Sequence, residues 1–234
     1  MRILGIIPAR YASTRFPGKP LADIHGKPMI QRVYEQAKKC KLLSEVVVAT
    51  DDSRIEEAVK KFKGKAILTS SKHESGTDRC REAAEKAGEK YDAVINIQGD
   101  EPFIQPGQIE KLAKCLSNKK VQIATLAKPI TDAHDLADRN TVKVTFDKNM
   151  EAINFSRTPT PHSPYKHIGI YGYRADVLSE ITKLSRSSRE IAESLEQLRW
   201  LENGYKISVE ITEHDAVSID TPEDLERALK KIPG

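Results

Sequence analysis

The sequence predicts an α/β fold with a mostly parallel, doubly wound central sheet. Apolar runs rich in β-branched residues alternate with charged segments whose apolar residues recur at helical spacing. Runs such as Val46–Ala49 are almost continuously apolar, which is typical of strands covered by helices on both faces. The alternation favours strand–helix–strand units and therefore a parallel sheet.

The elements follow in chain order. In the first half we expect strands at Ile3–Ile7, Val46–Ala49, Ala66–Leu68, Ala93–Ile97 and Ile123–Ala127, a helix beginning at Pro28 and another over about Arg79–Ala87. In the second half we expect strands at Ile168–Tyr173 and Lys206–Ile211, and helices over about Arg189–Asn203 and from Pro222. The last helix has the clearest start, because Thr221 can cap it and Pro222 suits a first turn.

The length of 234 residues predicts one domain over residues 1–234. The alternation stops after about Lys128, where Ala133–Asn140 is polar. Farther on, Arg157–Lys166 contains three prolines, Pro159, Pro161 and Pro164. Because proline disfavours regular helices and central strands, residues 129–166 are predicted to leave the core sheet and to carry substrate or subunit contacts.

The composition excludes several classes of protein. Lysine and arginine (38) nearly balance aspartate and glutamate (34), and the charges are spread along the chain, so a nucleic-acid partner is not expected. Cys40, Cys80 and Cys115 form no Cys-x-x-Cys pair, which argues against a disulfide framework or a zinc site. No apolar run is long enough for a signal sequence or membrane insertion. We therefore expect a cytoplasmic protein.

A cationic loop follows the first predicted strand. Ala9 leads into a segment that carries Arg10, Arg15 and Lys19, with the hydroxyl groups of Ser13 and Thr14 between them. Three cations on one short loop repel each other unless an anion lies among them, and hydroxyl and backbone donors around Gly18 suit a polyphosphate. The alternative is a solvated basic surface loop. The composition favours a phosphate-binding loop.

Two aspartates, one after a predicted strand and one before a predicted helix, suggest a magnesium site. Asp100 comes directly after Gln98-Gly99 at the carboxyl end of an apolar strand, and Asp220 directly precedes Thr221. A carboxylate facing a cationic phosphate loop is well placed to hold Mg²⁺ on a nucleotide. The alternatives are an Asx-turn for Asp100 and a helix-capping role for Asp220.

Two further segments could contact a nucleotide. Asp51 and Asp52 follow the strand at Val46–Ala49, and the polar segment His73–Arg79 precedes a helix. Backbone donors at a helix start bind anions or base edges. The alternatives are a simple helix start for the aspartates and an ordinary capped loop for His73–Arg79.

Other nucleotide and catalytic signatures are missing from the sequence. Both Gly-Lys pairs precede proline, so there is no Walker A motif, and neither Gly-x-Gly-x-x-Gly nor Gly-x-Ser-x-Gly occurs. P-loop ATPases, dinucleotide oxidoreductases and serine hydrolases are therefore disfavoured.

Taken together, these motifs resemble the 3-deoxy-D-manno-octulosonate (Kdo) cytidylyltransferases, or CMP-Kdo synthetases. The matching blocks, in order, are IPARYASTRFPGKPL, ATDD, TSSKHESGTDR, NIQGDEP, FSRTPTP, KHIGIYGYR, LEQLRWLENG and IDTPEDLE. Several such blocks in the same order along nearly the whole chain are far more specific than any one of them.

The resemblance implies a Rossmann-like nucleotidyltransferase fold, that of the nucleotide-diphospho-sugar transferases, and a homodimer. It implies the reaction CTP + Kdo → CMP-Kdo + diphosphate, which activates Kdo for lipopolysaccharide biosynthesis, with Mg²⁺ as cofactor; we expect two ions. In this reaction the sugar's anomeric hydroxyl attacks the α-phosphorus of CTP in line. The catalytic groups would be Asp100, Asp220, Lys19 and Arg10.

The resemblance also assigns residues to ligands. The phosphates would be held by Arg10, Ser13, Arg15 and Lys19, and the nucleotide site would be completed by Ala9, Thr14, Asp51, Asp52, Ser75, Gly76, Thr77, Arg79 and Gln98. Gln98, Arg157, His167, Tyr171, Glu196 and Gln197 would form the Kdo pocket, with Arg157 pairing with the sugar carboxylate. Tyr171 could instead be a core residue, Glu196 and Gln197 a solvated helix face, and His167 a hydrogen-bonded loop histidine.

Three other functions compete with this interpretation. A sugar or sialic-acid nucleotidyltransferase of the same fold would use another acceptor. A metal-dependent glycosyltransferase would accept a nucleotide sugar and release no diphosphate. A nucleic-acid-binding module would show salt-dependent binding to oligonucleotides, but aromatic residues make up only 6% of the chain.

Overall fold

The computed structural model describes residues 1–159 and 164–231, so Pro161 of the proline-rich segment lies outside the described residues. The chain divides into two compact units, one formed by Met1–Glu110 with Ala216–Gly234 and the other by Lys111–Asp215. The expectation of one domain over residues 1–234 therefore stays a prediction.

The first unit is built on a parallel sheet with the strand order β6-β1-β4-β5. Its strands are β1 (Ile3–Ala9), β4 (Glu45–Thr50), β5 (Ala66–Leu68) and β6 (Ala93–Asn96). In β1, Gly5 lies opposite Val46 on one side and Ile95 on the other. Nearly every residue of β1 is buried, as expected for a central strand covered on both faces.

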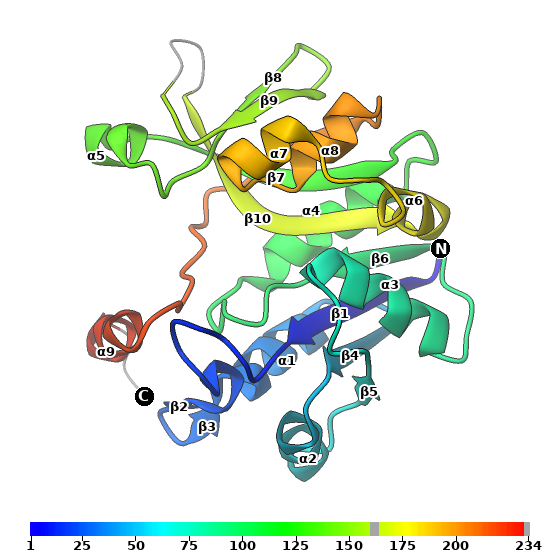
Figure 1. The fold of residues 1–234 in the computed structure, drawn as a ribbon, viewed down its shortest axis with the longest axis vertical. Helices are drawn as coiled ribbons and strands as arrows, with labels where there is room; N and C mark the ends of the chain where they lie inside the picture. The colour runs from blue at the N-terminus through cyan, green and yellow to red at the C-terminus, as the bar shows by residue number, and fades with distance from the viewer. Residues whose placement is uncertain (160–163, 232–234) are drawn as a thin grey trace. The chain divides into compact units, whose positions relative to one another are not determined.

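Helices cover this sheet. Its strands are contacted by α1 (Met29–Lys39), α2 (Ser53–Lys61) and α3 (Gly76–Lys86), and α4 (Pro106–Leu116) begins within this unit. Both α1 and α3 pack on β1 and β4, and Figure 1 shows α3 in front of β1 and α1 behind it. Met29, Val33 and Ala37 are buried along one face of α1, which is the amphipathic pattern expected of a helix on a sheet. The predicted doubly wound parallel arrangement is confirmed in this unit.

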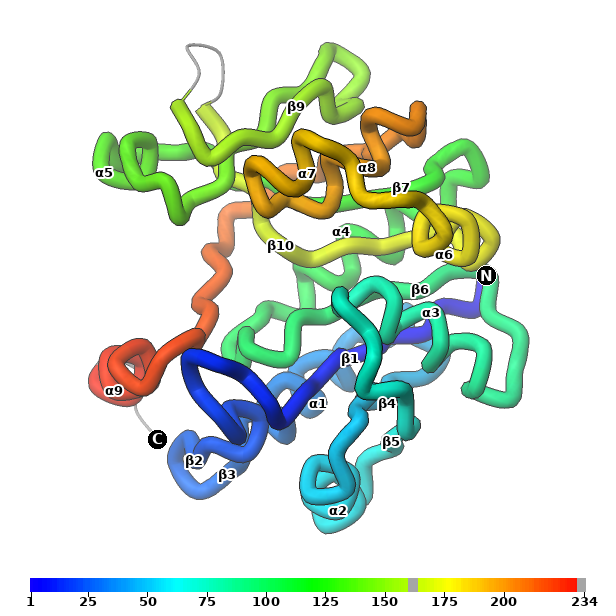
Figure 2. The backbone as a smooth tube through the Cα atoms, in the orientation of Figure 1, coloured from blue at the N-terminus to red at the C-terminus, as the bar shows by residue number. Residues whose placement is uncertain are grey.

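The end of the chain packs against an early hairpin. The short strands β2 (Asp23–Ile24) and β3 (Lys27–Pro28) follow the 3-10 turn η1 (Lys19–Leu21), and α9 (Pro222–Lys231) lies beside them, as Figure 2 shows. Ile24 and Met29 form a buried cluster with Ile219 and Ala228. The predicted start of the last helix is confirmed, because the Thr221 hydroxyl accepts a hydrogen bond from the Asp224 amide at 3.2 Å. This packing fixes the segment that carries Asp220.

The second unit contains a mixed sheet. Its strands are β7 (Ile123–Pro129), β8 (Lys143–Phe146), β9 (Ala152–Ser156), β10 (Tyr165–Arg174) and β11 (Ile207–Ile211). Strand β7 lies between β11, which is parallel to it, and β10, which is antiparallel. Strands β8 and β9 form an antiparallel pair, and β8 also pairs with β10 where Lys143 lies opposite Lys166. The part of the chain predicted to leave the parallel sheet thus contains a strand pair of its own.

The described part of this unit also contains the end of α4 and the short helices α5 (Ala133–Ala137), α6 (Ala175–Ile181), α7 (Ser188–Glu193) and α8 (Gln197–Glu202). The prediction of one helix over Arg189–Asn203 is wrong, because two helices occupy that segment. Ser187 and Glu190 form a capping box that starts α7, and Ser194 ends it with a left-handed backbone, φ 53°. Among the described residues, no helix is both long and apolar enough to span a bilayer.

Candidate active site

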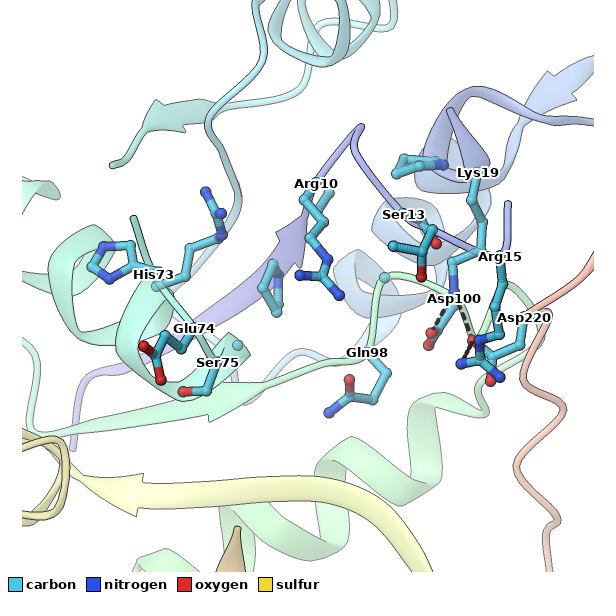
Figure 3. A pocket seen from close by; sticks show the side chains of 17 residues that line it. Arg10, Ser13, Arg15, Lys19, His73, Glu74, Ser75, Gln98, Asp100 and Asp220 are labelled. Carbon is cyan, nitrogen blue, oxygen red and sulfur yellow. Dashed lines mark hydrogen bonds and ion pairs between the residues drawn. The ribbon is translucent and has the colours of Figure 1, made fainter. Parts of the chain in front are cut away.

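Loops of the first unit enclose a cavity of about 370 Å³ at the carboxyl ends of β1 and β6. This is where open α/β sheets bind ligands. Figure 3 shows the side chains that line it. They are Pro8, Ala9, Arg10, Ser13, Thr14, Arg15, Lys19, Pro20, His73, Glu74, Ser75, Gly76, Arg79, Gln98, Gly99, Asp100 and Asp220. Most of the predicted nucleotide-site residues therefore lie around one cavity.

The loop after β1 brings the cations together. The Tyr11 carbonyl accepts hydrogen bonds from the Ser13 and Gly18 amides, both at 2.9 Å, which folds the loop back on itself. Gly18 has φ +74° and precedes η1, whose first residue is Lys19. A positive φ costs glycine little, so the chain can turn sharply here. In Figure 3, Arg10 lies in the middle of the cavity, between Lys19 and Ser75.

Lys19 joins the two aspartates that the sequence analysis placed at a metal site. Its Nζ lies 2.8 Å from Asp100 Oδ2 and 3.0 Å from Asp220 Oδ1, although these residues are far apart in the chain. Burial alone would lower the pKa of Lys19, but Asp100 and then Asp220 outweigh it and raise that pKa above its ordinary value. Arg15 Nη2 also approaches Asp220 Oδ1, at 3.1 Å. The two carboxylates thus converge on one cationic position.

This pair of carboxylates fits a magnesium ion that also binds phosphates. Among the described residues no cluster of three or more His, Cys, Asp or Glu side chains could hold a metal. Mg²⁺ on a nucleotide commonly uses only one or two carboxylates, with phosphate oxygens and water as the remaining ligands. Asp100 and Asp220 supply that donor set.

The neighbours of Asp100 fix its position. A Cβ atom on Gly99 would lie 2.6 Å from the Pro8 carbonyl oxygen, so only glycine allows this approach of two backbones. The Asp100 carbonyl accepts a hydrogen bond from the Ile219 amide at 2.9 Å, which ties the two acidic segments together. Glu101 is buried, and burial, with a smaller contribution from Asp100, raises its pKa to about 8. At neutral pH it therefore adds little negative charge beside Asp100.

Three of the predicted nucleotide contacts do not line the cavity. Asp51 pairs with the buried guanidinium of Arg79 at 3.1 Å, and Arg79 also donates to Thr69. Asp52 is the N-cap of α2 and accepts from the Arg54 amide at 2.9 Å. Thr77 is buried in the first turn of α3. The alternative from the sequence, that Asp52 marks the start of a helix, therefore describes its local role.

The opposite end of the cavity is formed by the segment before α3. Ser75 caps α3 by accepting from the Asp78 amide at 3.1 Å, and Gly76 packs close to Pro8. His73 contacts Glu82 of the same helix. Pro8, Pro20 and Gly99 line the cavity without having been among the predicted contacts, and His73 and Glu74 were included only as part of the segment His73–Arg79. Their positions beside predicted residues in the same motifs are the signal that could have included them.

Of the predicted Kdo residues, Gln98 lines the cavity and the other five belong to the second unit. Arg157, directly after β9, donates from Nε to the Glu193 carbonyl at 2.8 Å and from Nη1 to that of Arg139 at 3.3 Å. Glu196 precedes α8, and Gln197, its first residue, is buried. The description of Glu196 and Gln197 as a solvated helix face therefore does not suit Gln197.

His167 and Tyr171 lie on β10 in an aromatic cluster. Their rings are 5.2 Å apart, and Tyr171 meets the edge of Trp200 at 5.1 Å. Burial lowers the pKa of His167 to about 3, and its Nε2 lies 2.9 Å from Thr125 Oγ1, so its imidazole is neutral at neutral pH. Burial raises the pKa of Tyr171, and the negative charge of Glu196 raises it further. These neutral side chains can exchange hydrogen bonds with hydroxyl groups.

Comparisons with known proteins show which families and structures this chain is similar to. A family model described as cytidylyltransferase matches residues 4–207. A 3-deoxy-manno-octulosonate cytidylyltransferase of Parabacteroides distasonis is 58% identical over 98% of this chain and 97% of its own. The structure of a CMP:2-keto-3-deoxy-manno-octonic acid synthetase complexed with CTP superimposes with a TM-score of 0.94 at 44% identity, covering 99% of this chain and 98% of that one. A 4-diphosphocytidyl-2C-methyl-D-erythritol synthase of Anaerococcus prevotii shares the fold, with a TM-score of 0.67 at 16% identity, over 98% of this chain and 97% of its own.

The fold and the cavity together define a nucleotidyltransferase with the nucleotide-diphospho-sugar transferase architecture. Its cationic loop and paired carboxylates are the groups that such chemistry requires. The extent and identity of the matches go further: the chain belongs to the 3-deoxy-manno-octulosonate cytidylyltransferase family, the CMP-Kdo synthetases, which activate Kdo with CTP.

Proposed function

We propose that this protein catalyses CTP + Kdo → CMP-Kdo + diphosphate. The observation that supports this most directly, in a chain of this family, is the convergence of Lys19 with Asp100 and Asp220 at one end of a cationic cavity. The anomeric hydroxyl of Kdo forms a bond to the α-phosphorus, and the bond from that phosphorus to the bridging oxygen breaks. Diphosphate leaves without a covalent enzyme intermediate.

The chain's own part in this reaction is electrostatic. Arg10, Arg15 and Lys19 hold the triphosphate and offset the negative charge that grows on the departing diphosphate, while Ser13 and Thr14 add hydroxyl donors. Because the pKa of Lys19 is raised, it carries its charge throughout the neutral range. Ala9 contributes to the wall beside these groups.

Asp100 and Asp220 are the residues that would hold Mg²⁺. When bound, the ion supplies charge neutralisation on the phosphates and lowers the pKa of the attacking sugar hydroxyl. We propose two ions, as in the expectation from the sequence. Lys19, which pairs with both carboxylates, would then be available to the phosphates.

Base, ribose and sugar contacts complete the proposal. We assign the base and ribose to the segments around Asp51–Asp52 and Ser75–Arg79. We assign Kdo to Gln98 and to the residues of the second unit, where Arg157 pairs with its carboxylate and His167 and Tyr171 bind its hydroxyl groups. The neutral state of His167 supports the latter role.

We further propose a homodimer and a cytoplasmic location. Exposed apolar side chains of the second unit, Ile153 on β9 and Ile191 on α7, support an interface between copies. Cys40, Cys80 and Cys115 form no disulfide bond with one another, as suits a reducing compartment.

Diphosphate release tests the function. The purified protein is incubated with CTP, Mg²⁺ and Kdo, beside reactions without Kdo, with sialic acid in its place, and with EDTA. We expect release only with Kdo and metal. Release with sialic acid instead would assign the sialic-acid alternative, and release from a nucleotide sugar without diphosphate would indicate a glycosyltransferase.

A further inference from the structure

Tyr11 connects the phosphate loop to a part of the molecule outside the cavity. Its carbonyl holds the loop through the Ser13 and Gly18 amides, and its ring packs on the opposite end of the same loop. A Cβ atom on Gly18 would lie 3.1 to 3.2 Å from three atoms of the Tyr11 side chain. Tyr11 therefore holds the loop closed in two ways: its carbonyl accepts two hydrogen bonds, and its ring contacts Gly18.

An arginine lies over the ring of Tyr11. The guanidinium carbon of Arg54 lies 3.3 Å from the centroid of the Tyr11 ring, a short distance for a cation over an aromatic face. Arg54 belongs to the first turn of α2 and does not line the cavity. Its side chain is 56% exposed, so the contact is not a by-product of core packing.

Asp52 fixes the guanidinium in this position. Arg54 Nε donates to Asp52 Oδ1 at 2.9 Å and Nη2 donates to Oδ2 at 2.7 Å, a bidentate pair. Asp52 is itself held in place because it caps α2. A planar fork bound to a fixed carboxylate loses less freedom when it stacks than a free side chain does.

We propose that Asp52, Arg54 and Tyr11 form a brace that holds the loop of residues 11–18 in its phosphate-binding shape, and that Arg54 is a positioning residue for CTP. The brace rests on the proposed role of this loop in binding the triphosphate. A loop held in its bound shape binds more tightly because less ordering remains to be done on binding. Arg54 acts through Tyr11 and does not touch the nucleotide.

Two simpler roles make different predictions. Arg54 could attract the triphosphate by charge alone, in which case Arg54→Lys would bind CTP as well as the parent does. It could also serve only to stabilise α2, in which case its removal would lower thermal stability and leave CTP affinity unchanged. The brace requires the guanidinium of Arg54 to stack on the ring of Tyr11. Substitutions of these two residues should therefore not have additive effects on CTP affinity.

The experiment measures CTP affinity by calorimetry with Mg²⁺ present, KM for each substrate, kcat and thermal stability. The variants are Arg54→Ala, Arg54→Lys, Tyr11→Leu, Tyr11→Phe and the double variant Arg54→Ala/Tyr11→Leu. Lys60→Ala is the matched control, because Lys60 is a comparably exposed cation of α2 that pairs with Glu56 and does not line the cavity.

We expect Arg54→Ala and Tyr11→Leu each to weaken CTP binding by about 3- to 10-fold, with no further loss in the double variant. Arg54→Lys should fall between Arg54→Ala and the parent, and Tyr11→Phe, which keeps the ring, should bind CTP normally. The KM for Kdo and the melting temperature should stay near those of Lys60→Ala.

Parent-like CTP affinity of Arg54→Ala or of Arg54→Lys would overturn the brace, and so would additive losses in the double variant. The variant Lys19→Ala tests the proposed phosphate site independently of the brace. If Lys19→Ala binds CTP normally, the loop is not the phosphate site; if it fails while Arg54→Ala binds normally, only the brace is wrong.

Discussion

At the scale of single residues, function depends on which charges meet. Lys19 forms ion pairs with Asp100, 81 positions away, and with Asp220, 201 positions away. Each of these side chains alone would have an ordinary alternative role, as a surface lysine, an Asx-turn or a helix cap. Their convergence beside Arg10 and Arg15 supports the proposal that this site stabilises negative phosphate groups.

Asp100→Asn should reduce kcat by at least about 100-fold, because the amide keeps the size of the side chain but loses the charge that binds a metal. The measurement is diphosphate release with saturating CTP and Kdo. Melting temperature should change little, because Asp100 is partly exposed. Glu57→Gln, an exposed carboxylate of α2, is the control. Near-normal turnover by the folded Asn variant would remove Asp100 from the metal site.

Glu82 provides a prediction on acid stability. The Lys86 ammonium at 2.7 Å, the Ser70 amide and His73 hold its pKa at about 2, below the ordinary value of 4.5. A carboxylate whose pKa is lowered on folding stabilises the protein fully above about pH 4.5 and loses that contribution as the pH falls through about 2.

Glu82→Gln should therefore be less stable than the parent at pH 7, and the difference should shrink steadily below pH 4.5. Urea unfolding at pH 7, 4.5 and 3.5 measures it. Glu85→Gln on the same helix, whose carboxylate is 55% exposed, should show almost no difference at any pH. A deficit for Glu82→Gln that stays constant with pH would contradict the assignment.

At the scale of elements, backbone contacts position the site as strictly as side chains do. The approach of Gly99 to the Pro8 carbonyl brings the end of β6 against the end of β1. Proline and glycine beside these strand ends could be recognised in the sequence as turn residues. The contact between them could not, because it depends on how two strands align in the sheet.

Gly99→Ala should destabilise the protein by about 1 to 3 kcal/mol, because the new methyl group would meet a backbone oxygen that cannot move aside easily. It should also lower turnover by displacing Asp100. Gly107→Ala in the first turn of α4 is the control, since a Cβ there has open space and φ is not positive. Chemical denaturation of Gly99→Ala and Gly107→Ala measures this loss of stability. If the two variants are equally stable, the ends of β1 and β6 can move apart without cost.

A row of lysines in the second unit gives another prediction at this scale. Lys166 on β10 lies directly opposite Lys128 on one side and Lys143 on the other, an arrangement that is unfavourable without compensation. Asp215 pairs with Lys128 and Lys166, and Asp135 pairs with Lys166 at 2.6 Å. Lys143 is buried, and burial lowers its pKa although Asp138 and Asp135 oppose the shift.

Asp215→Asn should lower stability by about 1 kcal/mol in low salt, because two ammonium groups lose their shared counter-ion, and by less in 1 M salt. Lys143→Met should leave stability within about 1 kcal/mol of the parent or raise it, since it removes a buried charge. Thermal melts of both variants in low and high salt test this. A large loss in Lys143→Met would show that the buried ammonium is needed.

At the scale of the whole molecule, the proposed homodimer is the property to test. Ile153 and Ile191 are 61% and 58% exposed. The elements that carry them meet where Arg189 of α7 donates to Asn154 of β9 at 2.6 Å. Two exposed apolar side chains on adjoining elements are better accommodated in an interface than in water.

Sedimentation velocity should give the mass of a dimer for the parent and a shift toward monomer for Ile153→Asp/Ile191→Asp. Leu42→Asp, which changes an exposed apolar residue of the first unit, should keep the parent's mass. A monomeric parent, or a dimer unaffected by the double substitution, would contradict the proposed interface.

The strands β2, β3, β8 and β9 were not predicted from the sequence. Local patterns were enough to predict β1, β4, β5, β6, β7, β10 and β11, the helices α1, α3 and α9, the cationic loop and the family. Those features depend on periodicity and motifs within short stretches, where the local pattern carries the information. The ends of strands shifted by a few residues, and the break at Ser194 was missed because serine has no strong sequence signal for a left-handed backbone.

Which of these residues lie in contact could be seen only after the chain had folded. Lys19 between Asp100 and Asp220, Arg54 over Tyr11, and the row of opposed lysines all depend on sheet register and loop closure between distant segments. The place of Asp52 at a helix start was one of the alternatives from the sequence, but its bidentate pairing with Arg54 could be seen only in the structure. The physical reason is that ion pairs and ring contacts act over a few ångströms, and a one-residue change of register would reverse which side chains face each other.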